Sequence, residues 1–169
     1  MKTIIVMVMH GVPPNDFPRQ ELAEFFTLQG RLRRDPGPDK ALIMERHSSL
    51  ADKIRSWPRT PQNDPFHAGS QELAEHLSRQ TGYTVLVGYN EFCAPNVNEA
   101  LEEAARKQAQ RIVVVTSMMT RGGEHAEVEI PSLVQSFQTH HPEIETVYAW
   151  PFAANTVAQF LAEHISKFV

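Results

Sequence analysis

Two histidines and one glutamate are placed in the sequence where they could together bind a divalent metal ion. His10 directly follows an apolar segment, Glu91 follows a second one by two residues, and His125 lies in the loop after a third. Two imidazoles and a carboxylate suit a borderline ion such as Co²⁺, Fe²⁺, Ni²⁺ or Zn²⁺, and they leave coordination positions open for a substrate. These residue types and positions predict a metal site formed by His10, Glu91 and His125.

Each residue also has a simpler interpretation. A histidine at the end of a strand is more often structural or solvated than a metal ligand, and the chain contains 8 histidines. The metal hypothesis therefore depends on all three residues following strands whose ends meet. Gly122 and Gly123 precede His125, and we expect them to let its loop fold close to the site without side-chain obstruction.

Four short segments rich in apolar and β-branched residues have the pattern of strands. They are 3–9, 84–89, 112–118 and 146–150. The first and third are almost entirely apolar, which is typical of strands covered on both faces of a parallel sheet. In such a sheet ligands bind outside the carboxyl ends of the strands, which is where the three candidate ligands are expected to meet.

Helical patterns lie between these segments. Ser70 can cap a helix that ends at Gly82. Asn96 and Glu99 have the spacing of a capping box at the start of the next helix, and Pro131 suits the first turn of a third. Asn155 can cap the last helix, whose predicted buried stripe consists of Val157, Phe160, Leu161, Ile165 and Phe168. The alternation predicts a single three-layer α/β domain over residues 1–169, with a central parallel sheet of about four strands.

Residues 12–67 do not fit this alternation. They contain two helical patterns, near 18–29 and 40–57, separated by prolines. The apolar faces of these patterns are Leu22/Phe25/Phe26 and Leu42/Ile43/Leu50/Ile54. We interpret the segment as a helical insertion after the first strand that forms a lid over the strand ends. A surface elaboration without a role is the alternative.

The composition narrows the classes of function. The net charge is -4, which does not favour binding to nucleic acid or to an anionic membrane. No apolar segment approaches the roughly 18 residues of a membrane helix. The single cysteine, Cys93, rules out an internal disulfide and favours a reducing, cytoplasmic location. Neither a Walker loop nor a Gly-x-Gly-x-x-Gly motif is present, so no nucleotide cofactor is expected.

Three motifs resemble those of the class II tetrapyrrole metal chelatases, in particular the small sirohydrochlorin chelatases of the CbiX and SirB type. They are a strand ending in His10-Gly11, the segment 87–101 with Glu91 and Pro95 before a helix, and Gly-Glu-His-Ala-Glu-Val-Glu-Ile-Pro at 123–131. The last is similar to the family's Gly-x-His-x-x-x-Asp-Ile-Pro. The chain departs from the family at Val12, where a serine is usual, and at Glu129, where an aspartate is usual. The insertion is absent from the smallest members and weakly resembles one in protoporphyrin ferrochelatases.

The resemblance implies an enzyme that inserts cobalt, or else iron or nickel, into sirohydrochlorin or a related tetrapyrrole in cobalamin- or siroheme-type biosynthesis. The metal ion is then a substrate, held by His10, Glu91 and His125, and either His10 or Glu91 accepts a proton from the macrocycle. Glu129 would orient His125. Arg121 would bind substrate carboxylates, and the pocket walls would include Phe92, Met118, Met119 and Phe152. The alternative for these apolar side chains is a place in the core.

Two other functions are open to the sequence. A diverged member of this family could bind and deliver a metal or tetrapyrrole without catalysing insertion. The pair Arg46-His47 faintly resembles the Arg-His-Gly motif of histidine phosphatases, but Ser48 replaces the glycine and the pair lies in a helical pattern. Because the large class II chelatases resemble two such domains in one chain, this chain is expected to form a homodimer.

Overall fold

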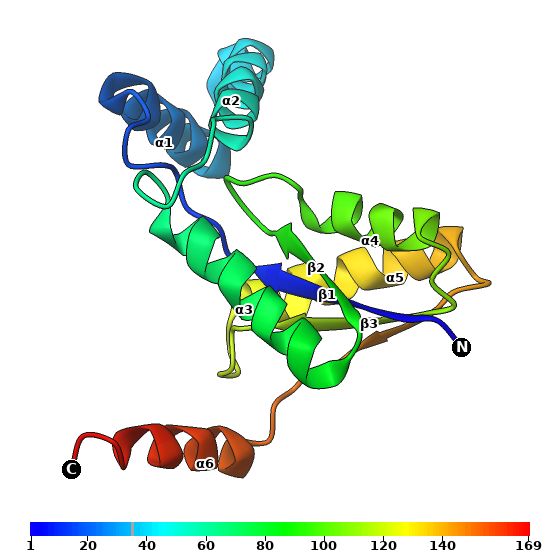
Figure 1. The fold of residues 1–169 in the computed structure, drawn as a ribbon. Coiled ribbons are helices and arrows are strands. Elements are labelled where there is room, and N and C mark those ends of the chain that lie inside the picture. Colours follow the sequence, from blue (N-terminus) through cyan, green and yellow to red (C-terminus); the bar gives the residue numbers. More distant parts are fainter. Residues whose placement is uncertain (35) are drawn as a thin grey trace.

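A four-stranded parallel sheet forms the centre of the computed structural model, which describes residues 1–34 and 36–169 (Figure 1). Its strands are β1 (Thr3–Met9), β2 (Thr84–Tyr89), β3 (Arg111–Thr116) and β4 (Glu145–Tyr148), and their order is β2-β1-β3-β4. The predicted α/β class and the parallel sheet are confirmed. The predicted third and fourth strands began one residue late and ended two residues late, because their last apolar residues belong to the loops that follow.

One face of the sheet is covered by α4 (Val97–Arg106) and α5 (Ile130–His140). Alternate residues of β1, namely Ile4, Val6 and Val8, pack with both helices in the largest buried cluster. Gly88 on β2 allows this packing, since a Cβ there would lie 3.0 Å from that of Ala100. The side chains between them, Met7 and Met9, point to the other face, as the alternation of a strand requires.

The other face is covered by α3 (Pro65–Thr81), which lies over β1 and β2. We expected this helix to begin at Ser70, and that prediction is wrong. Asp64 caps it by accepting a hydrogen bond of 2.8 Å from the backbone N–H of His67. Pro65 occupies the first turn, where a missing N–H costs nothing. Ser70 is instead a buried residue within the helix, and its hydroxyl donates to the carbonyl of Phe66.

The last helix, α6 (Ala154–Ile165), stands apart from the sheet (Figure 1). Our prediction of a buried stripe is wrong for this helix. Every residue from Ala158 to Val169 is exposed, including Phe160, Leu161 and Ile165. The prediction of Asn155 as its cap is also wrong, because the helix begins at Ala154. The periodicity correctly indicated an amphipathic helix, but periodicity cannot say which surface covers the apolar side.

The segment between β1 and α3 contains the two predicted helices, α1 (Arg19–Arg34) and α2 (Lys40–Arg55), joined by the short helix η1 (Gly37–Asp39). Position 35 of the predicted 12–67 insertion lies outside the described residues. The two helices pack through their own cluster, which includes Phe17, Phe25, Leu50 and Ile54. Of the predicted apolar faces, Phe26 and Leu42 are exposed instead.

A buried arginine joins this pair of helices to the rest of the chain. Arg59 donates hydrogen bonds to the carbonyls of Val12 and Ile54 and is paired with Asp64, whose side chain is fully buried. The pair of helices is therefore fixed to the root of β1 and to the start of α3.

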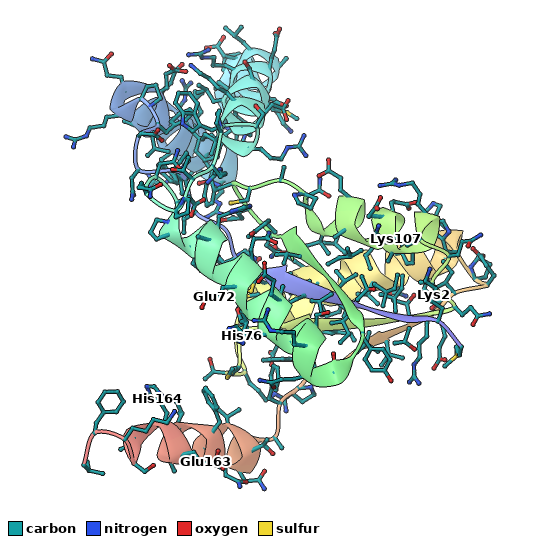
Figure 2. The ribbon with its side chains drawn as sticks, viewed as in Figure 1. Lys2, Glu72, His76, Lys107, Glu163 and His164 are labelled. Carbon is teal, nitrogen blue, oxygen red and sulfur yellow. The ribbon has the colours of Figure 1, made fainter. Side chains whose placement is uncertain are left out.

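The amino ends of the strands lie far from this pair of helices (Figure 2). There Lys2, just before β1, donates to the carbonyl of Lys107, just after α4. Across residues 1–34 and 36–169, each helix is too short or too polar to span a lipid bilayer.

Candidate metal site

His10, Glu91 and His125 lie together at the carboxyl edge of the sheet. Each offers a ligand atom, and these atoms all lie within 4.8 Å of one another. Nε2 of His10 is 3.7 Å from Oε2 of Glu91, and the ring centroids of His10 and His125 are 4.9 Å apart. The side chains are 43%, 29% and 24% exposed for His10, Glu91 and His125, so a substrate can approach while the protein still surrounds much of each group.

Gly11 is the reason that Glu91 can lie so close to His10. The backbone N–H of Glu91 donates to the carbonyl of His10 at 2.8 Å. A Cβ on Gly11 would lie 1.9 Å from the carbonyl oxygen of Glu91, and the φ of Gly11 is +89°. Only glycine meets both requirements without strain.

Each histidine has one ring nitrogen occupied by the protein. Nδ1 of His10 is 2.7 Å from the carbonyl oxygen of Gly11, which can only accept, so Nδ1 carries the proton. Nδ1 of His125 is 2.7 Å from Oε2 of Glu129. In the neutral form of each ring this contact leaves the lone pair on Nε2, which is the atom through which such an imidazole can bind a metal.

His125 begins η2 (His125–Glu129), a π-helical turn that runs directly into α5. Such turns are frequent at functional sites. The hydroxyl of Tyr148 donates to the carbonyl of Ala126 at 2.9 Å, and burial raises the pKa of Tyr148 to about 12, so this hydroxyl keeps its proton. The turn that carries His125 is therefore tied to the end of β4.

Phe92 links the three candidate ligands to α1 and α2. Its ring lies 6.5 Å from that of His10 and 6.0 Å from that of Phe25. Its φ of 59° is rarely adopted by non-glycine residues. The guanidinium of Arg59 donates to the Phe92 carbonyl, which helps to hold this conformation.

A pocket of about 310 Å³ opens between α1, α2 and the loop that carries Glu91. The apolar residues that line it are Phe25, Ala51 and Phe92, and Arg55 is the cationic residue of the lining. Arg55 also pairs with Asp52 at 3.3 Å and with Glu99 at 3.4 Å. The helices of the insertion thus border a cavity that reaches one of the three candidate ligands.

The other residues predicted to contact a tetrapyrrole are more scattered. Arg121 is 73% exposed, and its Nε donates to Glu127 at 3.2 Å. Met118 packs against the core on the α4 and α5 side, which is the alternative that the sequence left open for it. Met119 is 38% exposed. Phe152 is half-buried with its ring 5.5 Å from that of Trp150. Of the residues predicted to contact a tetrapyrrole, Phe92 is the one whose ring pairs with that of His10 in the described part of the chain.

We expected Gly122 and Gly123 to let the loop before His125 fold close to the site, and that expectation is wrong. A Cβ on Gly122 or Gly123 would meet nothing within 4 Å, so they do not make room for a close approach. Gly122 is instead suited to its backbone, which has a φ of +91°. The N–H of Gly122 and the guanidinium of Arg121 both hydrogen-bond to Glu127 and lower its pKa, which fixes the turn.

Three residues around the site were not predicted from the sequence. Asn90 donates to Oε2 of Glu129 at 3.0 Å, so two loops share this carboxylate. Arg55 lines the pocket and Arg59 holds Phe92. The position of Asn90 beside Glu91 was a usable signal, because a polar residue that ends a buried strand faces the site. The arginines lie in the insertion and have no spacing that marks them.

Comparisons with known proteins agree with this fold. A family model described as CbiX matches residues 63–167, which include Glu91 and His125 but not His10. A curated sirohydrochlorin cobaltochelatase from Methanopyrus kandleri is 34% identical over 65 residues, or 38% of this chain and 45% of that protein. The match thus spans less than half the length of this curated relative.

One solved structure in particular shows the same architecture. A CbiX protein from Marinobacter aquaeolei VT8 aligns over 98% of this chain and 94% of its own, with a TM-score of 0.55 and 13% identity. The sirohydrochlorin chelatase SirB from Bacillus subtilis subspecies spizizenii, in complex with cobalt, aligns over 89% of this chain and 44% of its own, with a TM-score of 0.46 and 20% identity. The family match covers well over half of the chain, and so this chain belongs to the CbiX family.

Proposed function

We propose that this chain is a metal chelatase that inserts a divalent ion, with cobalt the first candidate and iron or nickel the others, into sirohydrochlorin or a related tetrapyrrole. The observation that carries the proposal is the convergence of His10, Glu91 and His125 within 4.8 Å, in a chain of the CbiX family. The name of the M. kandleri relative supports the choice of substrate and metal.

The geometry supports a role for these residues in holding the incoming metal ion. Two Nε2 atoms and one carboxylate give three ligands, and the exposure of His10 leaves the opposite side of an ion open to another donor. Borderline divalent ions accept this ligand set, and which of them is used depends on availability as much as on affinity. The ion is a substrate that moves from these ligands to the nitrogens of the macrocycle.

Insertion exchanges one divalent ion for two protons. Four nitrogens of the tetrapyrrole bind the ion while two pyrrole N–H groups each lose a proton, so no electron is transferred and no redox cofactor is needed. His10 and Glu91 are the two groups placed to accept these protons, because their side chains face each other at 3.7 Å beside the proposed metal position. As the metal leaves, their ligand atoms become free to take up a proton.

The pocket beside Glu91 supports a position for the macrocycle. Phe92 and Phe25 offer apolar surface to a flat ring, and Arg55 offers a cation to its carboxylates. We therefore propose that α1 and α2 act as the lid over the strand ends. Arg121, Met118 and Met119 stay predictions as contacts of the substrate, and Arg121 would have to leave Glu127 to make one.

The test is an insertion assay with Co²⁺, Fe²⁺ under anaerobic conditions, and Ni²⁺, each with sirohydrochlorin and with a second porphyrinoid, followed by absorbance. We expect a rate well above the spontaneous one with sirohydrochlorin, and its loss in H10A and H125A. The matched control is H76A, because His76 is an exposed histidine on α3, outside the site (Figure 2).

The carrier hypothesis predicts a different result in the same assay. A carrier would bind metal or tetrapyrrole with a stoichiometry near one but leave the insertion rate at the spontaneous value. That outcome would overturn the chelatase proposal. Loss of metal binding in H10A would in that case still support His10 as a metal ligand. Unchanged metal binding in both H10A and H125A would overturn the site itself.

A further inference from the structure

Asn90 connects the two loops that carry Glu91 and His125. It directly precedes Glu91, and its backbone N–H donates to the carbonyl of Met9, the last residue of β1, at 2.9 Å. Its side-chain amide reaches the turn that begins with His125 and donates to Oε2 of Glu129 at 3.0 Å. Because the strand order is β2-β1-β3-β4, this bond passes across the end of β1, the strand between the two loops.

The chemistry of a carboxylate fixes the direction of both hydrogen bonds at Glu129. A carboxylate oxygen accepts, so Asn90 donates through Nδ2 and the ring of His125 donates through Nδ1. Both donors share the same oxygen, Oε2, at 3.0 Å and 2.7 Å. A carboxylate oxygen has the lone pairs for two donors, and a displacement of Oε2 would therefore change the position of the His125 ring.

The turn that carries His125 has few ties to the rest of the molecule. In the part of the chain that the structure describes, two hydrogen bonds join residues 120–129 to other segments. One runs from the hydroxyl of Tyr148 on β4 to the carbonyl of Ala126, and the other is the bond from Asn90. Since β4 carries none of the three candidate ligands, the bond from Asn90 is the one that relates His125 to a second ligand-bearing loop.

The amide of Asn90 lies between two pockets. The residue lines the pocket of about 310 Å³ together with Glu91, and it lines a smaller pocket of about 210 Å³ together with Glu129 and Leu133. With space on both sides, the amide is held by its hydrogen bond to Glu129 more than by packing. Removal of the amide is therefore expected to leave the surrounding core intact.

We propose that Asn90 is a positioning residue of the metal site, which fixes the ring of His125 relative to Glu91 through the carboxylate of Glu129. The inference rests on the proposed role of His125 and Glu91 as metal ligands. Asn90 acts on the ligand and not on the ion. Ligands must be held within about 0.5 Å of the productive geometry, and hydrogen bonds to their far side provide this.

The affinity for Co²⁺, measured by isothermal titration, tests this role without a tetrapyrrole. N90A removes the amide, and we expect it to bind Co²⁺ about tenfold more weakly than the wild type. The matched control is N98A, which should bind as the wild type does, because Asn98 is an exposed asparagine that lines the same smaller pocket. Circular dichroism verifies the fold of N90A. N90L, which keeps the approximate shape of the side chain without its donor, should show the same loss.

A double-mutant cycle tests whether Asn90 acts through Glu129. In an E129A background, N90A should cause no further change in the Kd for Co²⁺, because the acceptor of the amide is already absent. An equal, tenfold loss in both backgrounds would show that Asn90 acts independently of Glu129, and this would overturn the proposal.

The visible absorption spectrum of bound Co²⁺ is the second measurement, because its bands depend on the arrangement of the ligands. At saturating Co²⁺ we expect N90A and E129A to change the spectrum in the same direction, and N98A to keep that of the wild type. A wild-type affinity or a wild-type spectrum in N90A would overturn this proposal and leave the metal site in place. A wild type that binds no Co²⁺ would overturn the site and the role of Asn90 together. Neither measurement uses a tetrapyrrole, so a failed insertion assay would not change the result.

Discussion

Nδ1 of His125 lies 2.7 Å from Oε2 of Glu129, one turn further along the same helical segment. Both residues belong to η2, so the pair is set by the backbone of a single turn, and Asn90 holds the same oxygen from a second loop. The carboxylate thereby fixes which nitrogen of His125 is protonated and where the other points.

The first prediction concerns this carboxylate. E129Q keeps the size of the side chain but removes its charge, and we expect metal affinity to fall about 10- to 100-fold, as for other partners of metal-binding histidines. Isothermal titration with Co²⁺ measures the change. E124Q is the control, because Glu124 is an exposed neighbour on the same loop. Equal affinity in E129Q and the wild type would show that the pair does not orient a ligand.

Gly11 is the subject of the second prediction. In G11A the Cβ would meet the Glu91 carbonyl at 1.9 Å, so the loop must move and metal affinity should fall together with stability. G82A is a matched control, because Gly82 also has a positive φ, +74°, but its Cβ would meet nothing within 4 Å. Backbone conformation alone costs about 1–2 kcal/mol. Urea unfolding should show a larger loss than this for G11A, and equal losses in both variants would argue against the close approach.

A third prediction follows from the buried pair of Arg59 and Asp64. R59M leaves the fully buried carboxylate of Asp64 without its cation and releases the carbonyls of Val12 and Phe92. Removing one partner of a buried ion pair typically costs about 3–5 kcal/mol. R46M is the control, since Arg46 pairs with Glu24 on the exposed side of the insertion. A loss in R59M no greater than in R46M, measured by urea unfolding, would contradict the role of Arg59 as an anchor.

The fourth prediction tests the lid through Arg55. If Arg55 binds a carboxylate of the macrocycle, R55Q should raise the KM for tetrapyrrole about tenfold while the Kd for metal stays the same, because the change removes about 1.4 kcal/mol of binding. R46Q, on the same helix but outside the pocket, should leave both constants unchanged. A folded R55Q variant with the wild-type KM would leave the insertion without a role in substrate binding.

The pH dependence of stability is the fifth prediction. Burial lowers the pKa of His47, which stacks on Phe25 at 4.5 Å, and of His67, which stacks on Tyr89 at 5.4 Å. The folded state therefore favours the neutral rings. Their contribution to stability is complete above the usual imidazole pKa of about 6.5 and is lost as the pH falls below it toward the lowered values.

Urea unfolding at pH 7.5 and 5.5 measures this loss. H47F and H67F should each reduce the difference between the two pH values, and H76A, at an exposed position, should not. His141 acts in the opposite sense, because its bond to Glu102 raises its pKa. An increase in stability on acidification that persists in a His141 variant would contradict the prediction.

The sequence predicted the two central strands best. β1 is buried on both faces, and β3 is buried on the face under α4 and α5 and half-buried on the other, which agrees with the nearly continuous apolar segments from which they were identified. The three candidate ligands follow from the same pattern, since parallel strands place their carboxyl ends at one edge. The start of α3 was missed although Asp64-Pro65 is a clear helix start, because Ser70 was also a suitable cap.

What the sequence could not predict depends on contacts between distant segments. Arg59 has no local pattern that reveals its bond to the Phe92 carbonyl, and Asn90 is recognised only once Glu129 is placed beside it. The prediction for α6 failed for a further reason. An apolar stripe indicates an amphipathic helix, but it does not identify the surface that covers its apolar side.

The order of the strands separates the three proposed ligands widely along the chain. His10 and His125 come from neighbouring strands of the sheet but from opposite parts of the sequence, and Glu91 comes from a third segment. An unfolded chain therefore has no short chelating segment built from these residues, so an ion held by all three recognises only the folded state. Metal at 100 times its Kd would then stabilise the fold by about 2.7 kcal/mol, and the melting temperature becomes a direct gauge of which ions the site accepts.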